Sequence, residues 1–202
     1  MLSQGDATGD LSLLDWGKAY LKAEFDKPGN VFLGLVHRLD RPTSGVMVFA
    51  RTSKAASRLS AAVRERRLQK TYLALCCREP SAAQGLLEDW LLPGRDGGSS
   101  RIVAEGTAGA QHAALRWQLL GSDAAGALCE IALLTGRKHQ IRAQFAHRGA
   151  PLRGDSRYGA DRPYRPGAIA LHASRLAFPH PIGGGIIEVE STRTFPERAD
   201  GA

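Results

Sequence analysis

Apolar residues recur along the chain with two different spacings, and together these predict a mixture of helices and strands. Spacings of three to four residues are typical of amphipathic helices, whereas short runs rich in β-branched residues favour buried strands. In chain order we expect a helix over 11–22, strands over 31–36 and 46–50, a helix over 53–67, a strand over 70–77, strands over 113–120 and 127–134, a helix over about 138–148, and strands over 171–178 and 186–190. Asp10 or Ser12 is the expected N-cap of the first helix, and Ser53 that of the second.

The layout alternates helices and strands without an internal repeat. With 202 residues the chain is long enough for a substantial core, so we expect one domain over 1–202. The segment 93–100 is rich in glycine and serine and predicts a loop. The three glycines at 183–185 are interpreted as a hairpin turn, because no nucleotide-binding pattern accompanies them.

The charge balance favours an anionic partner without proving one. The formal net charge is +7, and arginine supplies 21 of the 27 basic residues. Arginine suits flat, bidentate phosphate contacts and stacking on bases, although a basic excess of this size also serves solubility.

Other classes find little support in the composition. The three cysteines form no C-x-x-C pair, and the six histidines show no convincing metal-ligand spacing. No apolar run has the length of a membrane span, and the first residues do not resemble a secretion signal. We therefore expect a protein of the reducing cytoplasm, without a metal and without a membrane partner.

The most informative segment is the run from His37 to Gly45, HRLDRPTSG, which joins the first two expected strands. It places the carboxylate of Asp40 between Arg38 and Arg41 and ends in a turn. An aspartate in such a turn often only caps it through a side-chain hydrogen bond. The alternative is a reactive carboxylate displayed beside an anionic substrate, on a connection where functional groups concentrate.

The full nine-residue string resembles the HRLD-x-x-TSG signature of the RNA pseudouridine synthases, in their RluA-like branch. The resemblance implies an α+β catalytic fold, with a largely antiparallel mixed sheet flanked by helices and loops. It also implies that Asp40 is the catalytic residue. Arg38, which lies on the same side as Asp40 if the chain is extended, is expected to enter the base stack after the target base leaves it.

Two further stretches extend this resemblance over most of the chain. Residues 69–74, QKTYLA, are similar to the family's K-x-Y-x-A strand and put Tyr72 in the role of its active-site tyrosine. Residues 134–142, LTGRKHQIR, followed by Gly154-Asp155 and Tyr158-Gly159, are similar to its TGR-x-HQIR and GD-x-x-YG stretches. Arg142 is then the expected partner of Asp40. The residues expected to bind RNA are Arg38, Arg41, Arg137 and Lys138.

The implied reaction is the isomerisation of uridine to pseudouridine in ribosomal or transfer RNA. The N1–C1′ bond breaks, the uracil turns and rejoins through C5, and the C5 proton leaves without net redox change. No cofactor is therefore expected, and we expect a monomer. The carboxylate of Asp40 can attack C1′, attack the uracil ring, or remove a sugar proton, and the sequence does not choose among these routes. Tyr72 is expected to stack on the flipped uracil and to accept the C5 proton.

One departure from the family pattern leaves a rival hypothesis open. Family members normally carry a strand and a Lys-Pro-Gly-type segment well before HRLD, and Lys27-Pro28-Gly29 lies too close to His37 to replace it. No separate N-terminal RNA-binding module is expected. The rival is an RNA-binding pseudoenzyme inactivated by a shortened N-terminus. An Asp-dependent glycosidase ranks lower, because no second carboxylate shows a partner role.

Overall fold

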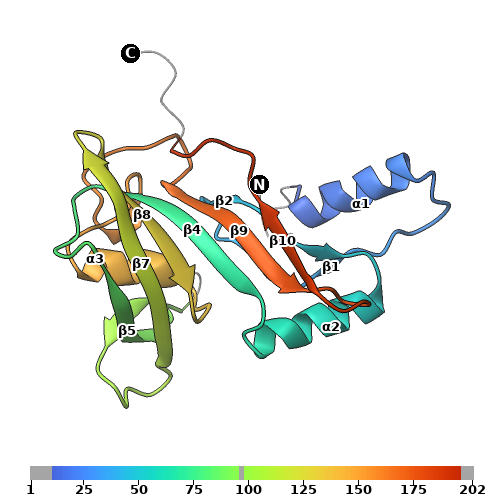
Figure 1. Cartoon of the computed structure of the whole chain (residues 1–202), viewed down its shortest axis with the longest axis horizontal. Helices are drawn as coiled ribbons and strands as arrows, with labels where there is room; N and C mark the ends of the chain where they lie inside the picture. Colours follow the sequence, from blue (N-terminus) through green and yellow to red (C-terminus); the bar gives the residue numbers. More distant parts are fainter. Residues whose placement is uncertain (1–10, 96–97, 197–202) are drawn as a thin grey trace. The chain divides into compact units, whose positions relative to one another are not determined.

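The structure of the protein is a computed structural model that describes residues 11–95 and 98–196, drawn in Figure 1. The chain divides into two compact units. Unit 1 consists of Met1–Arg41, Val46–Leu68 and Leu176–Val189, and unit 2 of Pro42–Gly45, Gln69–Arg175 and Glu190–Ala202. The expectation of a single catalytic domain over 1–202 stays a prediction, and each unit is described by itself below.

The predicted mixed α+β class is confirmed. The described residues contain three α-helices, a short 3-10 helix and ten strands. In chain order they are α1 (Leu13–Glu24), β1 (Gly34–Leu35), β2 (Ser44–Gly45), β3 (Phe49–Ala50), α2 (Ser53–Arg64), β4 (Gln69–Cys76), β5 (Gln84–Leu92), β6 (Arg101–Val103), β7 (Gln111–Asp123), β8 (Gly126–Leu133), α3 (Gln140–His147), η1 (Ser156–Tyr158), β9 (Leu171–Pro179) and β10 (Ile186–Glu190).

Helix α1 of unit 1 begins with a capping box. Ser12 is the N-cap: its hydroxyl accepts a hydrogen bond from the Asp15 amide at 3.2 Å, while the Asp15 carboxylate accepts one from the Ser12 amide at 3.3 Å. The two bonds satisfy amides that a helix start otherwise leaves without partners. Of the two predicted caps Ser12 is therefore confirmed, whereas Asp10 lies outside the described residues.

The strands predicted over 31–36 and 46–50 are mostly wrong. Only Gly34–Leu35 and Phe49–Ala50 pair, as a two-stranded antiparallel ribbon, and most of these apolar side chains are only partly buried. A run of apolar residues is compatible both with a hydrogen-bonded strand and with irregular backbone whose side chains pack against neighbours. Here most of the two runs is irregular backbone.

Helix α2 carries the core of unit 1. Its N-cap is Thr52, whose hydroxyl accepts from the Ala55 amide at 3.1 Å, so the prediction of Ser53 is wrong by one residue. The helix ends at Arg64 rather than 67, with Arg66 in a left-handed conformation. The cluster that the helix helps to form consists of Ala50, Ala55, Leu59, Leu68, Leu176 and Phe178.

A large, mainly antiparallel sheet organises unit 2. Its strands follow the order β9-β4-β8-β7-β5-β6, and β2 pairs with β9 in parallel. Strand β9 ends in unit 1, where the predicted hairpin turn to β10 is closed by a hydrogen bond from the His180 amide to the Gly185 carbonyl at 3.0 Å. Three strands of this sheet, β2, β5 and β6, were not predicted.

Helix α3 lies against one face of this sheet (Figure 1). Phe145 of α3 meets Trp117 of β7 edge to face, with ring centroids 5.7 Å apart. Residues 140–145 are all buried, polar ones included, and the helix ends before Gly149, whose φ of +74° suits glycine. No helix of the described residues is long and apolar enough to cross a membrane.

Candidate active site

The segment from His37 to Asp40 in unit 1 presents side chains to alternating sides. His37 and Leu39 are buried, whereas Arg38 is exposed and Asp40 partly exposed. The His37 ring anchors the inward side, because its Nε2 accepts a hydrogen bond from the Val48 amide at 3.1 Å. An extended chain has this period of two, so Arg38 and Asp40 point to the same side. The carboxylate is thus displayed by a short segment whose alternate side chains are packed.

The residues that follow, Pro42–Gly45, belong to unit 2 and are fastened to β9. The Ile169 amide donates to the Pro42 carbonyl at 3.0 Å, and the Ser44 hydroxyl lies 2.8 Å from Nδ1 of His172. Gly45 has a φ of +123°, and a methyl group at this position would run into the backbone of Ala173. The turn after Asp40 therefore requires glycine for its close approach to β9.

Tyr72 lies in the middle of β4, opposite Ile131 of β8, and is 6 % exposed. Lys70 lies two residues earlier, opposite Leu133, and so projects from the same face of the strand. Burial lowers the pKa of the Lys70 ammonium. This face of β4 thus combines an aromatic ring with a partly buried amine.

Arg142 of α3 is buried. Asp155 binds it with both carboxylate oxygens: Nε donates to Oδ2 at 2.7 Å and Nη2 to Oδ1 at 2.8 Å. The two side chains are 5 % and 1 % exposed. A guanidinium is tolerated at such depth because a carboxylate neutralises it and accepts its hydrogen bonds.

The aromatic ring of Tyr158 also contacts Arg142. The guanidinium carbon lies 5.0 Å from the ring centroid of Tyr158, a distance at which a cation is attracted to an aromatic face. The Tyr158 hydroxyl lies 3.0 Å from both the Ser100 carbonyl and Nδ1 of His139. Burial raises the pKa of this tyrosine. Asp155 occupies the Nε–Nη2 edge of the guanidinium, so the other edge, with Nη1, faces a different direction.

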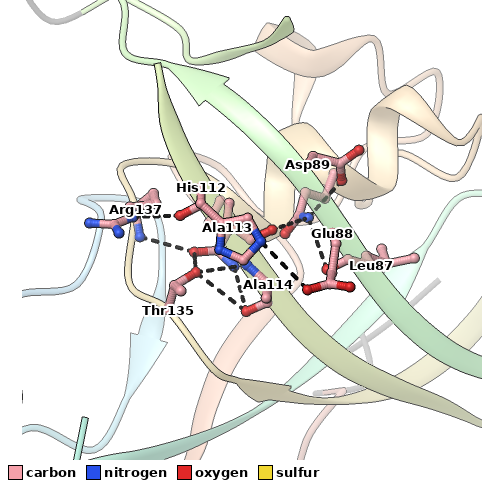
Figure 2. Close-up of polar contacts among 10 residues, drawn as sticks. Leu87, Glu88, Asp89, His112, Ala113, Ala114, Thr135 and Arg137 are labelled. Atoms are coloured by element: carbon pink, nitrogen blue, oxygen red, sulfur yellow. Dashed lines mark hydrogen bonds and ion pairs between the residues drawn. The ribbon is translucent and has the colours of Figure 1, made fainter. Parts of the chain in front are cut away.

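Two glutamines fix α3 to the sheet, and sequence reasoning missed them. Gln140 receives the hydroxyl hydrogen of Thr135 at 2.8 Å and donates to the Ala114 carbonyl at 3.0 Å, while Gln144 donates to the Asp89 carboxylate at 2.7 Å. Figure 2 shows this network around Thr135, Ala114 and Asp89. The only signal in the sequence is a pair of polar residues on the inner side of a short helix.

The residues expected to bind RNA lie in both units. Arg38 and Arg41 of unit 1 are exposed. In unit 2, Arg137 is partly buried and its Nε donates to the His112 carbonyl at 2.9 Å, as seen in Figure 2. Lys138 is exposed, with Nζ 3.4 Å from the Gly94 carbonyl. No cluster of three or more His, Cys, Asp or Glu side chains that could hold a metal ion occurs within 11–95 and 98–196.

Comparison with known proteins places these residues in a family. The sequence model of a family described as RNA pseudouridylate synthase matches residues 2–147, a segment that includes Asp40, Tyr72 and Arg142. The chain belongs to the RNA pseudouridylate synthase family. The resemblance drawn from the HRLDRPTSG run is thereby confirmed. Asp155 and His172 lie beyond the matched segment.

Named pseudouridylate synthases are similar to the chain over most of its length. The mitochondrial pseudouridylate synthase RPUSD4 of Xenopus tropicalis is 33 % identical over 169 residues, which cover 73 % of this chain and 52 % of the relative. The ribosomal large subunit pseudouridine synthase C of Vibrio cholerae is 31 % identical over 171 residues, covering 82 % and 53 %. The chain thus spans about half the length of these pseudouridylate synthases.

Solved pseudouridylate synthase structures share the fold. Human RNA pseudouridylate synthase domain containing 4 superposes with a TM-score of 0.79 over 96 % of this chain and 82 % of that chain, at 24 % identity. Human RNA pseudouridylate synthase domain containing 1 gives 0.68 over 86 % and 72 %, at 26 % identity. The α+β fold with a mainly antiparallel sheet is therefore that of the pseudouridylate synthases.

Proposed function

We propose that this chain isomerises specific uridines in RNA to pseudouridine, with Asp40 as the reacting carboxylate. The observation that carries the proposal is the family match over residues 2–147, which includes the HRLDRPTSG run. The displayed position of Asp40, on an extended segment with Arg38 on the same side, supports this role. The named relatives are synthases, which favours turnover over an RNA-binding pseudoenzyme.

Two side chains of unit 2 are proposed to complete the chemistry. Tyr72 stacks on the flipped uracil and accepts the C5 proton, and its place in a buried strand supports a fixed ring orientation. Arg142 is the proposed partner of Asp40, because an arginine beside a carboxylate favours the charged form and directs it through hydrogen bonds. Asp155 takes only one edge of the guanidinium, so the pairing with Asp155 does not compete with this role.

The target base must leave its stack before Asp40 reaches the sugar. Arg38 is proposed to fill the gap in the base stack, since its side chain is exposed and its guanidinium is flat. Arg41, Arg137 and Lys138 are proposed to contact the phosphate backbone. Ribosomal RNA is the first substrate to test, because one relative is named for the large ribosomal subunit. Other relatives are named mitochondrial or chloroplastic, so a cytoplasmic location stays a prediction, as does the monomeric state.

The test is pseudouridine formation in total ribosomal and transfer RNA by purified protein, mapped with a pseudouridine-specific chemical probe. Asp40→Asn should abolish every new site while leaving RNA binding intact. The matched control is Asp26→Asn, which removes an exposed carboxylate of unit 1 at a positive φ that asparagine tolerates.

New sites that persist in Asp40→Asn would overturn the role of Asp40. A folded wild-type protein that binds RNA and forms no pseudouridine in either RNA class would instead support the pseudoenzyme.

A further inference from the structure

Lys70 is a charged side chain for which the proposed chemistry has no use. It stands near the start of β4, opposite Leu133, which is the last residue of β8. Its side chain shares a face of the strand with that of Tyr72, and two residues along a strand span about 6.7 Å. Lys70 is therefore a neighbour of the proposed base-stacking tyrosine at the end of the β4–β8 ladder.

The ammonium of Lys70 is partly buried without a counter-charge. Among the described residues its Nζ makes no hydrogen bond and no ion pair, in contrast to Arg142 with Asp155. Burial of an unpaired charge costs free energy, and groups kept in that state concentrate at functional sites. Within residues 11–95 and 98–196, no carboxylate forms an ion pair with the Lys70 ammonium.

The glycine turn that follows β8 lies beside the Lys70 ammonium. A Cβ placed on Gly136 would lie 3.8 Å from Nζ of Lys70, so the ammonium lies beside the backbone of this turn. The next two residues are Arg137 and Lys138. Arg137 uses Nε to hold the His112 carbonyl, which leaves its terminal amino groups for another acceptor. Lys70 thus borders the Gly136 turn, whereas the Arg137 and Lys138 side chains that follow the turn reach the His112 and Gly94 carbonyls.

We infer that Lys70 binds a backbone phosphate of the RNA substrate, beside the Gly136 turn and next to the nucleotide that stacks on Tyr72. The inference rests on the proposed function and identifies the part of the RNA substrate that binds beside Lys70. A phosphate supplies the missing negative charge, and a compact ammonium on a flexible stem suits it. The open glycine turn lets a phosphate approach the backbone closely.

The experiment compares Lys70→Gln and Lys70→Arg with the wild type. RNA affinity is measured by filter binding between 50 and 200 mM salt (about the range in which counterion release is resolved), and the single-turnover rate is measured at saturating RNA. Lys70→Gln should weaken binding about tenfold and lower the slope of log affinity against log salt by about 0.7. Its rate at saturating RNA should stay close to that of the wild type, and Lys70→Arg should retain most of the affinity. The matched control is Lys54→Gln, an exposed lysine at the start of α2, which should change neither quantity.

A second measurement separates a binding role from a structural one. Because Lys70 makes no internal contact of its charge, Lys70→Met should unfold at a urea concentration equal to or above that of the wild type. An unchanged salt slope for Lys70→Gln would overturn the inference. So would a rate that falls at saturating RNA while affinity holds, which would assign Lys70 to the chemical steps, or a destabilised Lys70→Met.

The two proposals fail in different ways. If the wild type forms no pseudouridine but Lys70→Gln still lowers the salt slope, the phosphate contact stands and the proposed function fails. If pseudouridine forms and the salt slope is unaffected, only the inference on Lys70 fails.

Discussion

The Arg142–Asp155 pair shows how a single long-range contact decides the environment of a site residue. Removal of one partner from a buried ion pair leaves the other charge buried without a counter-charge. Asp155→Ala should therefore lower the free energy of unfolding by about 3–5 kcal/mol, measured by urea denaturation.

Unit 2 offers a matched control for this substitution. Arg78 and Asp161 form a second Arg–Asp pair, with both side chains more than half exposed. Asp161→Ala should change the free energy of unfolding by less than about 1 kcal/mol, because water screens and replaces the interaction. Equal losses for the two variants would show that burial of the Arg142 pair has no energetic consequence.

Residue-level expectations succeeded where they depended on local chain and failed where they depended on distant partners. The alternation from His37 to Asp40 follows from an extended backbone, so the shared side of Arg38 and Asp40 was predictable. The depth of Arg142 was not, because it depends on Asp155, thirteen residues further on and beyond the helix. Lys70 and Gln144 were missed for a related reason: a strand or helix pattern says which face a side chain takes, not what it meets there.

At the scale of elements, the contact between β2 and β9 joins the turn after Asp40 to a buried histidine. His172 is 2 % exposed, and burial lowers its pKa from the ordinary value near 6.5. As pH falls below about 6.5, the unfolded chain takes up a proton at this histidine that the folded chain does not. The free energy of unfolding should therefore fall with pH and level off below the lowered pKa of the folded state.

The measurement is the free energy of unfolding as a function of pH for the wild type and for His172→Gln. The variant should show a weaker decline below about pH 6.5, because it lacks the titrating group. His147→Gln is the control, since His147 is exposed at the end of α3. A decline of the same steepness in all three proteins would place the titration elsewhere.

Elements with a clear hydrophobic pattern were predicted, and elements without one were not. Helices α1, α2 and α3 and strands β4, β7, β8, β9 and β10 lie within a few residues of the predicted ranges. Strand β5 was not predicted because Glu88 and Asp89 interrupt its apolar positions, and only Leu87 and Leu91 are buried. Strand β6 has three residues, too few to show any period.

At the scale of the whole molecule, the net charge of +7 sets the field in which an RNA approaches. Each phosphate contact releases counterions and steepens the salt dependence of binding. Replacement of Arg38, Arg41, Arg137 and Lys138 together by glutamine should lower the slope of log affinity against log salt by about 2.8, or about 0.7 for each lost contact.

The control variant carries the same change of net charge on other exposed residues. It replaces Lys22, Lys27, Lys54 and Arg95 by glutamine. If both variants lose the same slope in filter binding, RNA responds to overall charge and the four proposed contacts are not specific.

The distribution of tryptophans over the two units has a spectroscopic consequence. Trp16 of unit 1 is about half exposed and stacked on Tyr20, whereas Trp90 and Trp117 of unit 2 lie in the sheet, Trp117 buried. Selectively excited tryptophan fluorescence of Trp16→Phe therefore reports on unit 2 alone, and that of a Trp90→Phe, Trp117→Phe double variant on unit 1. Each unit thus carries its own optical probe, so their melting can be followed separately without an added label.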